Sequence, residues 1–175
     1  MWLGSFNTPR QTQATLHGIP DGMGGAIATL KAMRQYVRDA IRDPHQQIRQ
    51  LALDIVGDAG WVGQARAIQQ WVQDNIRYIR DPIDSDGGVE LVQTPEKTLA
   101  DQAGDCDDQA TLVAALLSSL GHPSRFIAVW FSDPNDGHVL SQTLIGQQWV
   151  GVETIQPRPL GWFPPGVTSH YILKV

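Results

Sequence analysis

Apolar residues recur at helical spacing through the first half of the chain. The segments 26–42, 44–56 and 61–74 each carry apolar side chains three or four residues apart, which is typical of helices that bury one face. Asp43 and Pro44 predict the start of the second helix, because aspartate is a common N-cap and the first helical turn tolerates proline. Residues 1–25 are polar and rich in glycine, and they predict an extended arm.

A further helical segment follows the only cysteine of the chain. From Asp107 to Leu120 the residues are good helix formers, and Gly121 is placed to end the helix. The recurring apolar positions are Leu112, Val113, Leu116, Leu117 and Leu120. Cys106 therefore lies at the N-terminal end of a buried helix, where the partial positive charge of unpaired backbone N–H groups favours a thiolate.

The second half of the chain changes to the spacing of strands. Four segments alternate or form short apolar runs, namely 124–131, 138–145, 148–153 and 168–175. The last of these is expected at a sheet edge, and the proline-rich and aromatic residues 155–167 are expected to cover the fold. Helices followed by mainly antiparallel strands predict a single α+β domain over residues 26–175, in which the sheet packs on the Cys106 helix.

The surroundings of Cys106 determine which partner it needs. Asp105, Asp107 and Asp108 favour the neutral thiol, so a reactive thiolate requires a nearby cation. The same acids are expected to stabilise the helix start by about 0.3–1 kcal/mol each. His138 opens a predicted strand, and the short hairpin turn returns Glu153 to its vicinity, where a carboxylate can orient the imidazole.

The other histidines fit this role less well. His17, His45 and His122 lie in turn or helix-edge settings that predict exposure to solvent. His170 lies in the terminal strand, with no acid at hairpin distance. The expected catalytic set is therefore Cys106 as nucleophile, His138 as base and Glu153 as its orienter, an arrangement typical of papain-type acyl transfer.

The residues that would stabilise an oxyanion are less well defined by the sequence. The backbone N–H of Cys106 is the expected first donor, and Tyr78 or Gln102 is a candidate for the second. Trp149 is a candidate cleft residue.

Composition excludes several other classes of protein. A formal net charge of -5 and a pI near 5.4 give no electrostatic basis for binding nucleic acid. A single cysteine allows no internal disulfide, and no Cys/His cluster indicates a metal, so we expect neither a metal nor a cofactor. The acidic loop 81–88 lacks the ligand order of an EF-hand and is expected to be an ordinary turn. The sequence predicts no secretory signal and no membrane span.

Two runs of the sequence resemble the transglutaminase-like superfamily of papain-fold cysteine enzymes: GDCDDQATLVAALLSSLGHPSRFI and DGHVLSQTLIGQQWVGVET. In that family the motif cysteine begins the core helix, the histidine opens a strand, and the acid follows a strand that contains tryptophan. These features correspond to Cys106, His138 and Glu153, with Trp149 as the tryptophan. The third position is more usually aspartate, and Glu153 is one methylene longer.

The resemblance extends over roughly residues 26–166 through the segments IQQWVQDNIRYIRDP, VELVQTPEKTLADQAGDC and PLGWFPP. Together these segments look most like the small stand-alone transglutaminase-like proteins of tailed bacteriophages. The resemblance implies a peptidase, an amidase or a cross-linking enzyme, and the sequence does not choose between water and a lysine amine as acceptor. It also implies a protein or peptide substrate.

The phage resemblance further implies synthesis in the host cytoplasm and a part in tail or virion assembly or in host-cell penetration. Tail or baseplate proteins are then the expected partners. The alternative is a catalytically retired structural component of the tail tip or baseplate. The sequence leaves both readings open.

Overall fold

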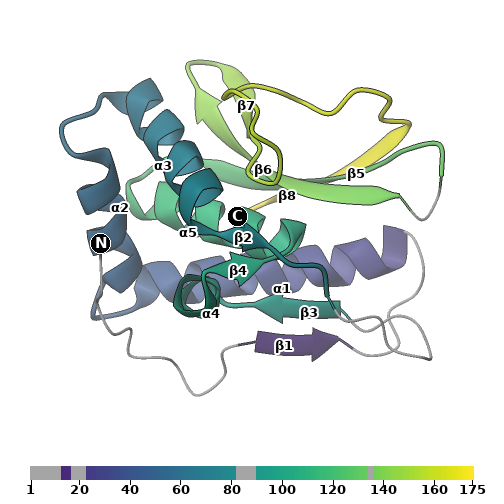
Figure 1. The fold of residues 1–175 in the computed structure, drawn as a ribbon, viewed down its shortest axis with the longest axis horizontal. Coiled ribbons are helices and arrows are strands. Elements are labelled where there is room, and N and C mark those ends of the chain that lie inside the picture. Colours follow the sequence, from purple (N-terminus) through teal and green to yellow (C-terminus); the bar gives the residue numbers. More distant parts are fainter. Residues whose placement is uncertain (1–12, 17–22, 82–89, 134–135) are drawn as a thin grey trace.

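The computed structural model describes residues 13–16, 23–81, 90–133 and 136–175. The described part of the chain has an α+β architecture, as the sequence predicts. Helices pack on one face of a four-stranded antiparallel sheet (Figure 1).

The described residues contain five helices: α1 (Met23–Arg42), α2 (Gln47–Val56), α3 (Trp61–Asn75), α4 (Pro95–Asp101) and α5 (Cys106–Ser119). Helix α5 lies in the middle of the molecule, between α1 and the sheet, and it also contacts α2, α3 and α4 (Figure 1). None of the described helices has both the length and the apolar character that a bilayer span requires.

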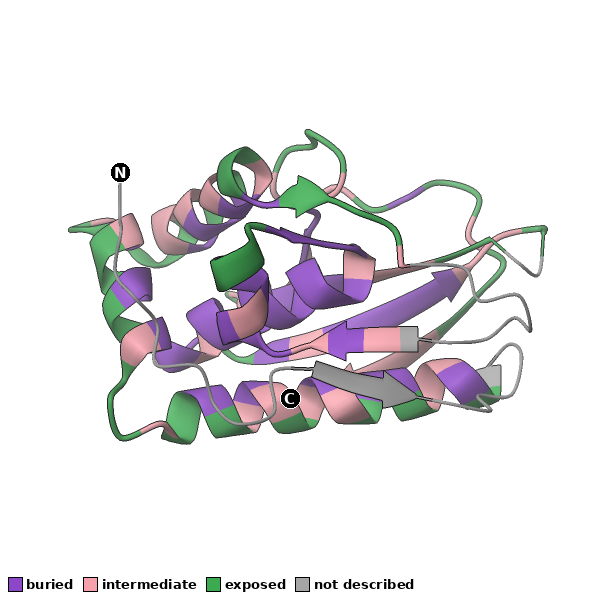
Figure 2. Ribbon diagram, turned by 60° about the horizontal axis from the view of Figure 1, so that its bottom comes forward, coloured by how far each residue is buried: buried purple, intermediate pink, exposed green. Residues whose placement is uncertain are grey.

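Burial is greatest along α5. Its apolar side chains from Ala110 to Leu117 are at most 2% exposed, and polar residues of its first turns are buried with them (Figure 2). The outer helices instead bury one side and expose the other, as their apolar spacing predicts (Figure 2). The core is therefore built around the helix that begins at the only cysteine.

Four strands form the main sheet: β5 (Ser124–Trp130), β6 (Gly137–Ile145), β7 (Gln148–Val152) and β8 (Ser169–Lys174). Their order is β7-β6-β5-β8 with antiparallel pairing throughout, so β8 lies at an edge as predicted.

Two smaller pairings complete the described strands. Strand β1 (Gln13–Leu16) pairs antiparallel with β3 (Glu90–Gln93). Strand β2 (Arg77–Tyr78) pairs in parallel with β4 (Ala103–Gly104), which leads directly into α5. The second pairing therefore fixes the backbone just before Cys106.

Side-chain hydrogen bonds set the direction of β6 relative to α5. The Ser141 hydroxyl donates to the Ala110 carbonyl near the start of α5, at 2.7 Å. The Thr143 hydroxyl donates at 3.0 Å to the carbonyl of Pro123, beyond the end of α5. Strand and helix therefore run in the same direction, and both begin at the same end of the molecule.

The segment that follows β7 lies against the edge of the sheet. The Gly161 N–H donates to the Gly151 carbonyl at 2.9 Å. A Cβ atom at Gly151 would lie 2.5 Å from the carbonyl oxygen of Trp162, so this position has no room for a side chain. The prediction that residues 155–167 cover the fold is confirmed.

Two helix starts differ from the sequence prediction. The first helix begins at Met23 rather than at residue 26. The second begins at Gln47 rather than at Pro44, because residues 43–46 form a turn in which the Asp43 carboxylate accepts from the His45 N–H at 3.2 Å. Gln46 then adopts the left-handed conformation, with φ of 51°, which delays the helix.

Candidate active site

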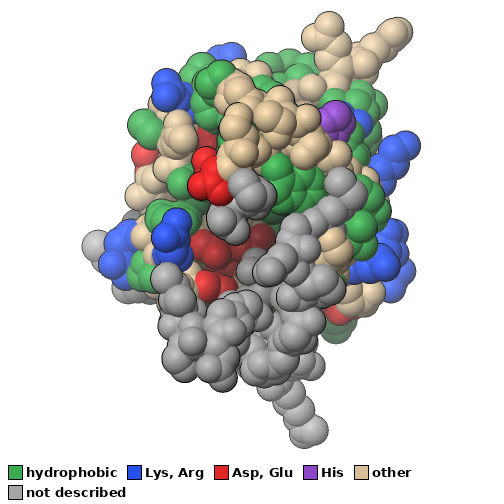
Figure 3. All heavy atoms as spheres, turned by 90° about the vertical axis from the view of Figure 1, so that its right-hand side faces the viewer, with side chains coloured by type: hydrophobic (Ala, Val, Ile, Leu, Met, Phe, Trp, Pro, Cys, Tyr) green, Lys and Arg blue, Asp and Glu red, His purple; other side chains and the backbone are tan. Residues whose placement is uncertain are grey.

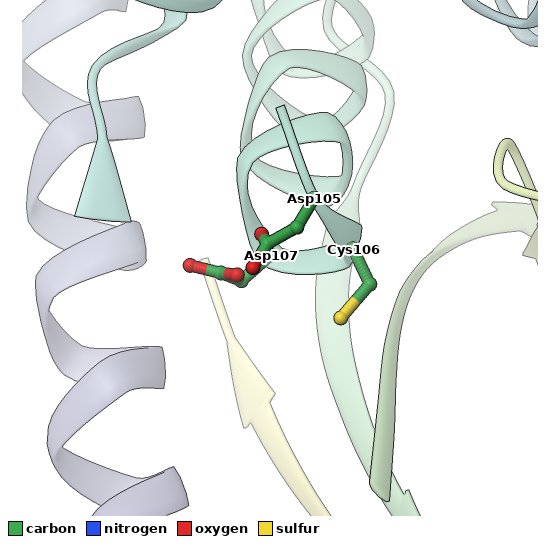
Figure 4. A group of neighbouring side chains, drawn as sticks. All are labelled: Asp105, Cys106 and Asp107. Carbon is green, nitrogen blue, oxygen red and sulfur yellow. The ribbon is translucent and has the colours of Figure 1, made fainter. Parts of the chain in front are cut away.

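Cys106 is the first residue of α5 and is half-buried. Its thiol lies at the first turn of the helix, beside Asp105 and Asp107 (Figure 4). The backbone before it is tightly packed, because a Cβ atom at Gly104 would lie 2.6 Å from the Cβ atom of Asp108. The Gly104 carbonyl accepts from the Gln109 side chain at 3.2 Å. These contacts fix the turn that presents the thiol.

The side chains of His138 and Glu153 are hydrogen-bonded across the hairpin. Nε2 of His138 lies 2.7 Å from Oε2 of Glu153. Glu153 is 1% exposed, whereas His138 is only partly buried. The proximity that the hairpin turn predicts is therefore confirmed. Because Nε2 is bonded to Glu153, Nδ1 is the ring nitrogen left to act on another group.

The Glu153 carboxylate is fixed by the turn in which it lies. Its Oε1 accepts from the backbone N–H groups of Ile155 and Gln156, at 2.7 and 3.1 Å. Burial alone would raise the pKa of Glu153, but the hydrogen bond and charge of His138, together with these two N–H groups, outweigh it and lower the pKa. Glu153 is therefore an ionised acceptor for the imidazole.

The thiol and the imidazole lie at the same end of the α5–β6 pair. The Ser141 to Ala110 hydrogen bond is the reference point for both. Cys106 precedes Ala110 by about 6 Å along the helix, from the helical rise. His138 precedes Ser141 by about 10 Å along the strand, in the same direction. The fold therefore places the predicted nucleophile and the predicted base at one end of the molecule.

Asp108 supports the cysteine turn. Its carboxylate accepts from the N–H of Gln93 on β3 at 2.7 Å and from the N–H of Asp105 at 3.3 Å. Burial, followed by the charge of Asp105, raises the pKa of Asp108 to about 8, although both hydrogen bonds oppose this rise. Asp108 therefore joins β3 to the start of α5.

Asp107 is also buried, but its surroundings differ from those of Asp108. Among the described residues, no backbone N–H group donates to either carboxylate oxygen of Asp107 or to Oδ1 of Asp105. Burial is the largest cause that raises the pKa of Asp107 well above its ordinary value, followed by a hydrogen bond between its carboxyl group and that of Asp105 and by the charges of Asp105, Asp108 and Cys106. Ionised, these carboxylates would repel one another, so the site favours a proton or a cation between them.

The three acids at the start of α5 are all buried. Asp105, Asp107 and Asp108 are 8%, 1% and 0% exposed. Figure 3 shows acidic side chains recessed in a hollow on one face of the molecule. Burial raises the pKa of Asp81, the hydrogen bond from the Leu91 N–H opposes this rise, and the charge of Asp105 adds to it. The rest of the predicted acidic turn 81–88 lies outside the described residues.

One group of atoms has the spacing of a metal site. Carboxylate oxygens of Asp105 and Asp107 and the Sγ atom of Cys106 all lie within 4.8 Å of one another. The buried oxygens of Asp105 and Asp107 are hard donors of the kind that calcium prefers, whereas a thiolate suits softer metals such as zinc. The two carboxylates therefore fit a hard cation better than the full group of three does.

The two candidates for the second oxyanion donor differ in position. Tyr78 pairs with Gly104, two residues before Cys106. Partial burial raises the pKa of Tyr78, and the charges of Cys106 and Asp105 add to the rise while Arg80 opposes it. The phenol therefore lies close enough to the thiol to feel its charge. Gln102 is exposed at the C-terminal end of α4 and adopts a left-handed conformation.

Trp149 does not belong to the site, contrary to the sequence expectation. It pairs with Leu144, near the turn of the hairpin. That position is six residues along β6 from His138, or about 20 Å at the rise of a strand. Its ring instead stacks under the Arg125 guanidinium, 4.3 Å from the ring centroid. The tryptophan therefore supports the sheet rather than the cleft.

The expectation that His122 is exposed is wrong. This residue is 2% exposed, and its ring stacks on Trp61 with ring centroids 3.6 Å apart. Its Nε2 lies 2.9 Å from the Gln64 side-chain oxygen. Burial lowers the pKa of His122, which favours the neutral imidazole. His122 therefore fixes the start of α3 to the turn after α5. His45 is exposed as predicted, whereas His17 lies outside the described residues.

Two residues that the sequence prediction missed lie behind Glu153. The side-chain amides of Gln69 and Gln73 on α3 donate to the Glu153 carbonyl, at 2.8 and 2.9 Å. Gln69 is 3% exposed. It lies beside Ile68 and Val72 on the buried face of α3, and a polar residue at such a position is the signal that could have revealed it.

Several solved structures have folds similar to that of this chain. A candidate cysteine protease from Cytophaga hutchinsonii has a TM-score of 0.55 and 18% identity, with 82% of this chain and 55% of that one covered. A candidate protease from Parabacteroides distasonis has a TM-score of 0.55 and 14% identity, with coverages of 75% and 26%. The chain therefore spans well under two thirds of either protein.

Calcium-bound LapG from Legionella pneumophila has a TM-score of 0.55 and 15% identity, and 79% of this chain matches 80% of that one. At such identities these likenesses concern the fold. No curated protein sequence matches the chain. The family model described as the transglutaminase-like superfamily matches residues 49–154, which is more than half of the chain and includes Cys106, His138 and Glu153. The chain therefore belongs to the transglutaminase-like superfamily.

Proposed function

We propose that this protein is a cysteine-dependent acyl-transfer enzyme of the peptidase or amidase type. Cys106 is the nucleophile, His138 the general base and acid, and Glu153 the residue that orients the imidazole. The observation that carries the proposal is the 2.7 Å hydrogen bond between His138 and the buried, ionised carboxylate of Glu153. His138 lies at the start of β6, which is the end of that strand beside the start of α5. The helix end and an imidazolium both favour the thiolate of Cys106.

The reaction proceeds through two acyl transfers. The Cys106 sulfur attacks the carbonyl carbon of an amide, and the new C–S bond places negative charge on the carbonyl oxygen. The Cys106 N–H and the Tyr78 phenol are the proposed donors to that oxygen. As the C–N bond breaks, Nδ1 of His138 gives its proton to the departing amine. The product at this stage is a thioester on Cys106.

Resolution of the thioester restores the enzyme. His138 takes a proton from water, the oxygen attacks the thioester carbon, and the C–S bond breaks to return the thiolate and release a carboxylic acid. A lysine amine in place of water forms a new amide and cross-links two proteins. The buried acids beside Cys106 disfavour anionic groups, which favours a neutral or cationic acyl donor such as a glutamine or peptide amide.

The first prediction concerns the two reacting residues. Cys106→Ser and His138→Ala should each lower amide hydrolysis by at least about 10³-fold, because each removes a member of a unit that acts together. Hydrolysis is measured by mass spectrometry on a mixture of glutamine-containing and basic peptides. His170→Ala, which changes an exposed histidine of β8, is the matched control and should keep full activity. Hydrolysis that persists in Cys106→Ser contradicts the proposal.

The second prediction uses the lowered pKa of Glu153. A carboxyl whose pKa falls on folding stabilises the protein above its unfolded pKa of about 4.3, and this contribution is lost as the pH falls through the folded value. The difference in the free energy of unfolding between the parent and Glu153→Gln, measured by urea denaturation, should therefore be largest above about pH 4.3 and shrink as the pH falls below that value. A difference in the free energy of unfolding that stays constant as the pH falls would show that Glu153 is not held as an ionised partner.

We also propose that Asp105 and Asp107 bind a hard divalent cation such as calcium, although the sequence analysis predicts no metal. Three of their carboxylate oxygens are buried and accept from no backbone N–H group of the described residues, which is the supporting observation in this chain. LapG from Legionella pneumophila, which shares the fold, has been solved in a calcium-bound and in an EGTA-treated form. The cation would neutralise acids that otherwise disfavour the thiolate.

Calcium should therefore raise the unfolding temperature relative to EGTA. At a concentration of 100 times its dissociation constant, the gain is about 2.7 kcal/mol. Asp107→Asn should remove this response and, in EGTA, should be at least as stable as the parent, because it replaces a carboxyl whose ionisation burial opposes with a neutral amide. Asp101→Asn changes an exposed acid of α4 and should respond as the parent does. Equal unfolding temperatures of the parent in calcium and EGTA would rule out the site.

The phage setting rests on the sequence resemblance. The protein would act during tail or virion assembly or host-cell penetration, or it would serve as a catalytically retired component of the tail tip or baseplate. Mass spectrometry of purified particles tests this setting, and absence of the protein from them would contradict a structural role.

A further inference from the structure

We infer that Gln69 and Gln73 of α3 are positioning residues that hold the Glu153 turn so that its carboxylate meets His138. The inference rests on the proposed function and extends it to a part of the fold that contacts neither the thiol nor the imidazole in any described interaction. It makes α3 the element that sets the position of Glu153 and His138 relative to Cys106.

The two glutamines bind one short stretch of backbone. Gln69 donates to the carbonyls of Glu153 and Arg158, at 2.8 and 3.3 Å. Gln73 donates to the carbonyls of Glu153, Gln156 and Arg158, at 2.9, 3.1 and 3.2 Å. All acceptors are backbone oxygens, so only the amide nitrogens of the two side chains can face them. The whole turn from residue 153 to residue 158 is therefore tied to α3.

Because this turn is held in place, the Glu153 carboxylate is held as well. Oε1 of Glu153 accepts from the N–H groups of Ile155 and Gln156, which belong to the same turn. Oε2 is thereby directed to Nε2 of His138. A turn released from α3 would move these N–H groups, and a displacement of about 1 Å near a reacting group can cost about 10²-fold in rate.

The same element also supports the nucleophile. Directly after α3, the Arg77 N–H donates to the Gln102 carbonyl at 2.9 Å, and the Ile79 N–H donates to the Gly104 carbonyl at 3.2 Å. These bonds hold the backbone just before Cys106. Residues 61–79 therefore connect the acid turn on one side to the cysteine turn on the other, which sets their relative positions.

Gln70 provides a matched control on the same helix. It is exposed, and its side-chain amide donates to the Asp74 carboxylate at 2.9 Å rather than to the acid turn. Replacement of glutamine by methionine keeps the length of the side chain and removes both N–H donors. Gln69→Met, Gln73→Met and Gln70→Met therefore differ mainly in which contacts are lost.

The experiment is a titration of the Glu153 carboxyl by carbon NMR in the full-length parent and in the three variants, with thermal unfolding to confirm that each is folded. Gln69→Met and Gln73→Met should shift the titration midpoint upward, towards the ordinary glutamate value of about 4.3. Gln70→Met should leave it unchanged. Gln73→Lys restores an N–H donor at a partly exposed position and should return the midpoint towards that of the parent.

Steady-state kinetics gives the second measurement. Gln69→Met and Gln73→Met should each lower kcat about tenfold or more with little change in KM, because orientation of the base matters in the transition state. The inference is overturned if the Glu153 titration midpoint is the same in the parent and in all variants. It is also overturned if Gln70→Met shifts the midpoint as much as Gln69→Met and Gln73→Met do. The parent protein could hydrolyse no amide while the Glu153 titration midpoint still shifts in Gln69→Met and Gln73→Met but not in Gln70→Met. That result refutes the proposed function and leaves the positioning role intact.

Discussion

The burial of α5 is the constraint on which the rest of the structure depends. The helix is packed on several sides by α1, α2, α3 and α4 and by the sheet, so its first turn can lie in only one place. The Ser141 to Ala110 hydrogen bond then fixes β6 against that first turn. As a result, a thiol at the beginning of the helix and an imidazole at the beginning of the strand share one end of the molecule. The site follows from how the core packs.

Burial also creates an electrostatic conflict at Cys106. The helix end favours a thiolate, while the buried acids Asp105, Asp107 and Asp108 oppose a second negative charge beside them. The Asp108 carboxylate accepts from two backbone N–H groups, whereas no backbone N–H group of the described residues donates to the Asp107 carboxylate. His138 on one side and a bound cation on the other would resolve the conflict, and each would do so by supplying positive charge.

Much of this arrangement could be predicted from the sequence, because periodicity and turn length are local signals. The spacing of the leucines predicts α5, and the short turn after Ile145 predicts that His138 and Glu153 lie close together. Local signals failed where a tertiary contact decides the outcome. His122 is buried because Trp61, far away in the sequence, stacks on it.

The same reason explains the errors at the site. Trp149 lies on β7, the strand that leads to Glu153, but the strand register places it at the opposite end of the hairpin from Glu153. Gln69 and Gln73 contact the Glu153 carbonyl across sequence separations of 84 and 80 residues. No pattern along the chain reports such a contact, although a glutamine on a buried helical face indicates that a partner exists.

The central claim is that His138, held by Glu153, makes Cys106 a nucleophile. The most direct measurement is the rate at which low iodoacetamide modifies Cys106 at neutral pH, followed by mass spectrometry of the intact parent and of His138→Ala. The account predicts fast modification of the parent and much slower modification of the variant, because loss of the imidazolium removes the cation that favours the thiolate. Equally slow modification of both proteins would contradict it and would indicate a catalytically retired site.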